Sequence, residues 1–297
     1  MTNQKELVHK FDWDILVVID ACRYDYFKKY YREIFDNGKL QKVKSPAVWT
    51  FGWIVETFKG KVWHDIVLLK NWVSGYVLSK EEFDMESKDW IITDVIKHMK
   101  YQSYAKKKFF DTVIKMQPGK EYATLYPEDA YNKTLDAIKK YPDKKIVLFF
   151  RQVHEPYLYW LERNMVPDEE QDWRPGDSKI GQIKRLIYVN FIQKILTSEQ
   201  MWKIVDTFGL QPNGPTGNIW LKYGWEGVIK GYTEDMKTVL RYAKKLADKY
   251  PDKKVVITSD HGELLGEHGR FGHTTNKRYK EVVEVPWFVI GGRDDKN

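Results

Sequence analysis

The segment 258–275, TSDHGELLGEHGRFGHTT, holds three of the seven histidines in this 297-residue chain. Asp260 and His261 are adjacent in it, and His273 lies near its end. Carboxylate oxygens and imidazole nitrogens are ligands of zinc, and of manganese or magnesium where carboxylates dominate. Four glycines between the two histidines allow tight turns, so that the imidazoles can meet from opposite sides of a loop. The segment therefore predicts a divalent metal site.

Three segments, the one above included, place such side chains after apolar runs. Asp20 follows ILVVI directly, His154 follows IVLFF after three residues, and Asp260 with His261 follows VVITS. Such short, β-branched or aromatic runs are typical of buried parallel strands, and ligands bind beyond the carboxyl ends of those strands. We therefore expect Asp20, Asp260 and His261 to bind one metal, with His154 at the same edge of the sheet.

The segment SPAVWTFGW contains two candidate nucleophiles, the hydroxyl groups of Ser45 and Thr50. Two metals about 4 Å apart can clamp the attacking and leaving oxygens of a displacement at phosphorus, and a hydroxyl bound to such a cation loses its proton readily. Thr50 precedes a helix-like stretch, residues 51–58, whose N–H groups and dipole suit an incoming anion. The sequence alone equally allows Thr50 to be an ordinary helix N-cap.

These side chains need a scaffold of alternating strands and helices. Strands are expected at 15–19, 66–69, 146–150, 255–257 and 285–290, and helices near 128–140 and 233–249. The alternation predicts an α/β fold with a central, mostly parallel sheet between helices. Residues 1–297 are expected to form a single domain. Within it, residues 162–231 do not follow the alternation of strands and helices. They are interpreted as a helical and loop insertion, helical near 180–208.

Composition limits the class of protein. The chain is 42% hydrophobic and 15% aromatic, which excludes a disordered protein, and its formal net charge of +7 favours anionic ligands. Lys and Arg are interspersed with Asp and Glu, so nucleic acid is not an expected partner, and no apolar run is long enough to span a membrane. The polar N-terminal segment and the single cysteine, Cys22, lead us to expect a cytoplasmic protein.

Five motifs in this order resemble the alkaline phosphatase superfamily, and more narrowly its sulfatase-like branch: IDACRYDYF, SPAVWTFGW, HEPY, TSDHGELLGEHGRFGH and EVPWFVIGG. The resemblance spans residues 14–292, and SDHGE with GEHG is its most specific part. It implies a mostly parallel sheet between helices, one or two divalent metals, zinc first among them, and a covalent enzyme intermediate.

The resemblance also implies roles for individual residues. Asp20 and the pair Asp260–His261 match ligands of the first metal, and Thr50 matches the nucleophile that also contacts that metal. His273 stands where phosphoethanolamine transferases and alkaline phosphatases have a ligand of the second metal. His154 resembles the histidine that helps to hold this second metal or the substrate anion.

The remaining polar residues of these motifs have subsidiary roles. His268, in the GEHG turn, is expected to support the site without binding a metal. Glu263 and Glu267 either orient the ligands from outside or face solvent. Arg23 is a candidate for substrate contact, the alternative being a pair with Asp25.

One departure from the sulfatase pattern decides the predicted activity. Sulfatases oxidise a Cys or Ser within C/S-x-P-S-R, whereas the matching stretch here is TFGWI. The resemblance therefore implies a metal-dependent hydrolase or transferase of phosphate mono- or diesters that acts through Thr50, and not a formylglycine sulfatase. The alternatives are a sulfate-ester hydrolase, or a non-catalytic module that binds an anionic glycan or lipid headgroup through the Trp-rich insertion.

Overall fold

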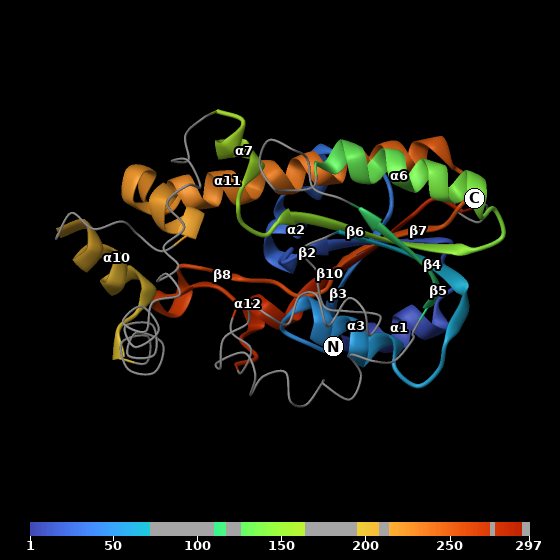
Figure 1. The fold of residues 1–297 in the computed structure, drawn as a ribbon, viewed down its shortest axis with the longest axis horizontal. Helices are drawn as coiled ribbons and strands as arrows, with labels where there is room; N and C mark the ends of the chain where they lie inside the picture. The colour runs from blue at the N-terminus through green and yellow to red at the C-terminus, as the bar shows by residue number, and fades with distance from the viewer. Residues whose placement is uncertain (72–109, 117–125, 164–194, 208–213, 274–276, 293–297) are drawn as a thin grey trace, which may run out of the picture. The chain divides into compact units, whose positions relative to one another are not determined.

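An eight-stranded sheet forms the centre of the computed structural model, which describes residues 1–71, 110–116, 126–163, 195–207, 214–273 and 277–292 (Figure 1). Its spatial order is β1-β3-β10-β7-β2-β6-β4-β5. The strands are β1 (Thr2–Asn3), β2 (Ile15–Asp20), β3 (Lys39–Lys44), β4 (Trp63–Asn71), β5 (Phe110–Met116), β6 (Lys145–Val153), β7 (Val255–Ser259) and β10 (Glu284–Ile290).

The sheet is mostly parallel, which confirms the predicted α/β class. Each described pair of neighbouring strands is parallel except the two pairs that β10 forms with β7 and β3. The four-residue helix α12 (Lys280–Val283) leads directly into β10, and the N–H of Ser45, just after β3, bonds to the carbonyl of Val283. The strand thus begins at the edge where β3 and β7 end, and it therefore runs antiparallel to both of them.

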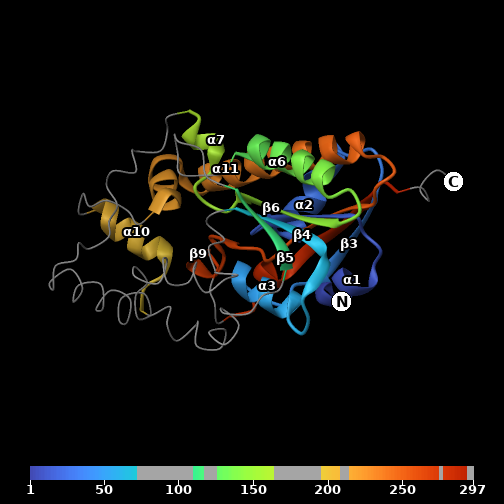
Figure 2. The same ribbon diagram turned by 45° about the vertical axis from the view of Figure 1, so that its right-hand side comes forward.

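Helices cover both faces of this sheet (Figures 1 and 2). On one face lie α1 (Gln4–Lys10) and α3 (Thr50–Phe58). On the other lie α6 (Pro127–Lys140) and the part of α11 (Gly214–Lys249) from residue 236 onward.

Two successive residues of β10 show how these layers pack. The ring of Trp287 meets Phe11 at the end of α1, whereas Phe288 packs against Phe27 of α2 (Tyr24–Tyr30) and against Phe35. Because neighbouring side chains of a strand point to opposite faces, α2 lies on the face of the sheet opposite to α1. The short 3-10 helix Tyr31–Glu33 follows α2.

The chain divides into two compact units. The first contains the sheet and comprises residues 1–154, 236–263 and 273–297; the second comprises 155–235 and 264–272. The described elements of the second unit are α7 (Leu158–Leu161), α10 (Ser198–Thr207), the first part of α11, and the strands β8 (Leu264–Leu265) and β9 (Phe271–Gly272), with the 3-10 helix Glu267–Gly269 between them.

The predicted insertion, residues 162–231, falls within this second unit and is only partly described. Residues 164–194 and 208–213 lie outside the described residues, so the predicted helix near 180–208 is represented by α10 and the residues just before it. Among the described residues, no helix is both long and apolar enough to cross a membrane.

A buried carboxylate, Asp235, holds the start of α7. It accepts the N–H groups of Leu158 and Tyr159 at 2.7 and 2.8 Å, and it is 3% exposed. Burial raises the pKa of Asp235 from 3.8 to about 7, although the two backbone hydrogen bonds lower it. The folded protein therefore retains a proton that the unfolded chain has lost between these pH values.

This retained proton predicts a pH-dependent stability. Since the folded pKa is the higher one, the contribution of Asp235 to stability falls as pH rises from about 4 to about 7, by up to about 4 kcal/mol. Asp235→Asn should flatten that part of the pH profile of the unfolding free energy, measured by urea denaturation. Asp248→Asn, which changes an exposed aspartate of the same helix, should leave the profile as in the wild type; equal profiles for all three proteins would contradict the prediction.

Candidate metal centre

Three neighbouring parallel strands end at one edge of the sheet with ligand-type side chains. Asp20 is the last residue of β2, and Asp260 follows the end of β7, which pairs with β2 in register from Ile15 to Ile19. His154 follows β6, which pairs with β2 on its other side. The sheet therefore places these residues at a common edge, as parallel strands require.

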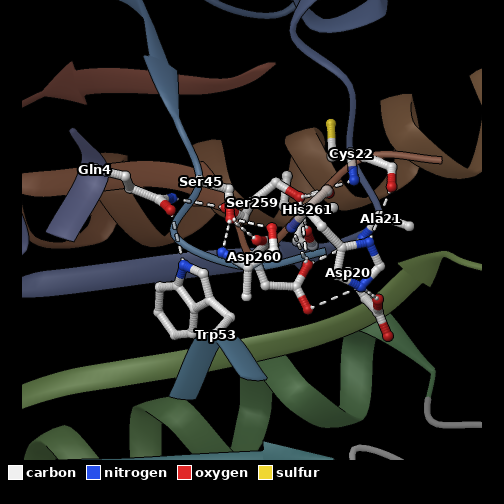
Figure 3. Close-up of polar contacts among 12 residues, drawn as sticks. Gln4, Asp20, Ala21, Cys22, Ser45, Trp53, Ser259, Asp260 and His261 are labelled. Atoms are coloured by element: carbon white, nitrogen blue, oxygen red, sulfur yellow. Dashed lines mark hydrogen bonds and ion pairs between the residues drawn. The ribbon is translucent and has the colours of Figure 1, made fainter. Parts of the chain in front are cut away.

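Asp20, Asp260 and His261 converge into one buried group (Figure 3). Each offers one ligand atom, and these three atoms all lie within 4.8 Å of one another. Nε2 of His261 is 3.6 Å from Oδ1 of Asp20 and 3.5 Å from Oδ2 of Asp260. None of these three atoms has a hydrogen-bond partner, although all are buried. Because buried polar atoms are normally satisfied, the group points to a missing positive partner.

The separations fit a divalent metal. Ligand atoms around a tetrahedral ion with bonds of about 2.1 Å lie about 3.4 Å apart. The two distances from Nε2 of His261 are close to this value. Two carboxylates and one imidazole also match the oxygen and nitrogen ligands that zinc, manganese and magnesium accept. The residues present thus fit a divalent cation.

The backbone fixes which atom of each ligand faces the group. Oδ1 of Asp260 accepts the N–H of Ala21 at 3.2 Å and that of His261 at 2.8 Å, which leaves Oδ2 for the cation. Nδ1 of His261 lies 3.0 Å from the carbonyl of Gly262. A carbonyl only accepts, so Nδ1 carries the proton and Nε2 keeps its lone pair for a metal.

Electrostatics give the same indication. Burial and the nearby charge of Asp260 raise the pKa of Asp20 well above its usual value, against an opposing effect of Arg151. Two buried carboxylates placed so closely cannot both ionise at low cost. A divalent cation between them would remove this penalty.

His154 and His273 lie beside the group. The ring centroid of His273 is 4.3 Å from that of His261 and 5.5 Å from that of His154. The ring of His273 is therefore adjacent to the rings of both His261 and His154. His268 belongs to the second unit, where it has a left-handed φ of 57°.

Ser45 directly follows β3, at the same edge of the sheet, and Thr50 comes five residues later in the chain. Ser45 is completely buried, and its hydroxyl lies 2.5 Å from the carbonyl of Asp260 and 2.9 Å from that of Ala47. Thr50 is the first residue of α3 and is partly exposed. The connecting segment is therefore anchored on Asp260 through Ser45, while Thr50 begins the helix whose first N–H groups lack intrahelical partners.

Cys22 is unsuited to nucleophilic attack. It is completely buried, and burial followed by the charges of Asp25, Asp260 and Glu263 raises the pKa of its thiol. A thiol that does not ionise is a poor nucleophile and a poor metal ligand.

Arg23 is engaged within the protein. Its guanidinium pairs with Asp25 at 2.7 Å and donates to the carbonyl of Glu263 at 3.3 Å, so the structure contains the pairing that was the alternative to substrate contact. Glu263 is 3% exposed and does not face solvent. Glu267, in the second unit, accepts the N–H of Leu265 at 2.7 Å.

The sequence interpretation missed a buried polar network behind the ligands (Figure 3). Gln4 donates to the hydroxyl of Thr258 and to the carbonyl of Ser259, both at 2.7 Å, and accepts from the indole of Trp53 at 2.7 Å. Gln4 precedes the first predicted strand and carries no motif, so no signal in the sequence could have linked it to this site.

The fold is similar to known structures at low sequence identity. The soluble domain of lipooligosaccharide phosphoethanolamine transferase A from Neisseria meningitidis is 13% identical with a TM-score of 0.44, covering 94% of this chain and 76% of that one. The C-terminal periplasmic domain of EptC from Escherichia coli, in complex with Zn, is 12% identical with a TM-score of 0.44, covering 98% and 75%.

A third similar structure is the phosphonate monoester hydrolase of Agrobacterium radiobacter, which is 9% identical with a TM-score of 0.49, covering 94% of this chain and 68% of that one. No protein-family model matches the chain, and no curated protein matches its sequence. A shared activity does not follow from similarities of this size.

These comparisons correct one expectation. The chain was expected to be cytoplasmic, yet similar structures, EptC of Escherichia coli and of Campylobacter jejuni among them, are periplasmic domains. The cytoplasmic expectation is therefore wrong. Its basis was weak in physical terms, because a protein with a single cysteine cannot form an internal disulfide in any compartment, and Cys22 therefore does not distinguish between compartments.

Proposed function

We propose that this protein is a metal-dependent hydrolase or transferase of phosphate esters, with Thr50 as the nucleophile of a covalent intermediate. The observation that carries the proposal is the buried group of Asp20, Asp260 and His261. Three ligand atoms without hydrogen-bond partners lie within 4.8 Å of one another. An arrangement so costly without a cation supports a site built to hold one.

Each residue has a distinct task in this proposal. Asp20, Asp260 and His261 hold the first metal, and His154 and His273 hold a second one or the substrate anion. A divalent cation, zinc first and manganese or magnesium next, supplies positive charge that lowers the pKa of a nearby hydroxyl and stabilises negative charge on the transferred group.

Thr50 provides the attacking oxygen and, in the same proposal, a further ligand of the first metal. It begins α3, whose first N–H groups and positive dipole end favour the anionic group of an ester. Neither of the other candidates is as accessible, since Ser45 and Cys22 are completely buried. The proposed substrate is an anionic phosphate ester, either a monoester or a diester.

A substrate panel tests this function. The protein, freed of metal and reloaded with Zn²⁺, Mn²⁺ or Mg²⁺, is assayed on aryl phosphate monoesters, phosphodiesters and sulfate esters. Turnover of a phosphate ester that disappears with a chelator and returns with metal is the expected result. Turnover of sulfate esters alone would replace the proposal by a sulfate-ester hydrolase. Absence of any stoichiometric metal would contradict the proposed enzymatic function and favour the non-catalytic module that binds an anionic glycan or lipid headgroup.

A further inference from the structure

Ser259 joins the two turns that carry the metal ligands (Figure 3). It is the last residue of β7 and is completely buried. Its hydroxyl lies 2.6 Å from the carbonyl of Ile19 and 2.5 Å from that of His261, and it accepts the N–H of Cys22 at 2.8 Å. One side chain therefore contacts the residue before Asp20, the second residue after it, and one of the other two ligands.

The backbone hydrogen bonds between β2 and β7 do not connect these two turns. Ile19 and Ser259 form the last paired position between β2 and β7. Beyond it, Asp20 is in register with β6 across an irregularity, and Ala21 adopts a left-handed φ of 61°. The separation of Asp20 from His261 therefore depends on side chains, namely the Ser259 hydroxyl and Oδ1 of Asp260, which accepts the N–H of Ala21.

We propose that Ser259 is a positioning residue that sets the distance of Asp20 from Asp260 and His261, and thereby the metal affinity of the site. This inference rests on the proposed metal binding. Without the hydroxyl, the N–H of Cys22 loses its acceptor and the carbonyls of Ile19 and His261 lose their shared donor. Each turn can then relax, and the three ligand atoms no longer meet at the separation that one cation requires.

Thr258 offers a matched control. It is also completely buried and precedes Ser259 in β7. Its hydroxyl lies 2.5 Å from the carbonyl of Pro286 and accepts from Gln4 at 2.7 Å, and both of these partners lie outside the ligand-bearing turns. Thr258→Val removes a buried hydroxyl from the same strand at nearly constant volume, so it reproduces the general cost of losing buried hydrogen bonds.

The experiment compares Zn²⁺ affinity, measured by competition with a chromophoric chelator, in the wild type, Ser259→Ala and Thr258→Val. We expect Ser259→Ala to bind Zn²⁺ about 10 to 100 times more weakly, the usual cost of losing a group that orients metal ligands. Thr258→Val should bind as the wild type does. The visible absorption of bound Co²⁺, which reports coordination geometry, should change in Ser259→Ala alone.

The possible results separate the two proposals. A wild type that binds no Zn²⁺ would overturn the metal site itself. A wild type that binds, with Ser259→Ala binding equally well, would overturn the role of Ser259 alone, as would an equal loss in Ser259→Ala and Thr258→Val. If Ser259→Ala does not fold, Ser259→Cys takes its place, because a thiol is only a weak hydrogen-bond donor. Weaker Zn²⁺ binding by Ser259→Cys, without the absorption band of a thiolate bound to Co²⁺, would support the positioning role. Unchanged Zn²⁺ binding would contradict it.

Discussion

Asp260→Asn is expected to abolish stoichiometric metal binding while the protein remains folded. The amide keeps an oxygen that can accept the N–H groups of Ala21 and His261, as Oδ1 of Asp260 does. It replaces Oδ2, the atom that faces His261 at 3.5 Å, by an NH₂ group that cannot bind a cation. The loss of Zn²⁺ affinity should exceed the factor of about 10 to 100 that follows from changes outside the ligand shell.

Metal content after dialysis and chelator competition measure this loss. The metal-free variant should be at least as stable as the metal-free wild type, because one of two adjacent buried carboxylates has gone. Asp235→Asn is the matched control, because the buried Asp235 side chain also accepts two backbone N–H groups. The Asp235→Asn variant should retain its full metal content. Stoichiometric metal in Asp260→Asn would exclude Asp260 as a ligand.

The strands that build the sheet centre could be predicted because they are buried on both faces. All residues of β2 and β7 are buried, and such strands are continuous apolar runs in the sequence. Strand β3, which lies between the two-residue edge strand β1 and β10, was not predicted. Its sequence, KLQKVK, has a single fully buried residue, Val43, so it lacks both a continuous apolar run and a regular alternation.

The direction of the last strand also lay beyond the sequence. The run 285–290 is apolar and has its predicted extent within a residue, but nothing in it distinguishes a parallel from an antiparallel partner. Its direction follows from the connection before it, where α12 has four residues and leaves the chain at the edge where β7 ends. Topology of this kind depends on where a connection lies in space.

The candidate site was predictable as far as its ligands lie at the ends of apolar runs. Asp20, Asp260 and His261 satisfy that rule, and the structure brings their ligand atoms together. The groups that hold these ligands do not satisfy it. Ser259, for example, acts through hydrogen bonds to Ile19 and Cys22, which lie 240 and 237 positions away in the chain, and such pairings leave no local pattern in one sequence.

Thr50→Ala is expected to remove turnover by a factor of at least about 10³, the scale of losing a nucleophile, while metal content and stability stay close to those of the wild type. Thr50 begins α3 and is partly exposed, so the substitution removes one small side chain from a helix start and leaves the buried group of ligands unchanged. Thr50→Ser should retain much of the activity because the attacking oxygen survives.

The contrast with Ser45 makes this prediction decisive. Ser45 is completely buried against the carbonyl of Asp260, so Ser45→Ala should lower stability and metal affinity together, with turnover recovering at saturating metal. Thr50→Ala should instead stay inactive at every metal concentration. Turnover of phosphate esters and Zn²⁺ content, measured on the same preparations of both variants, separate these behaviours. An active Thr50→Ala with an inactive Ser45→Ala would move the nucleophile to Ser45. Activity in both would indicate direct attack by water, because neither hydroxyl would then be needed for bond formation.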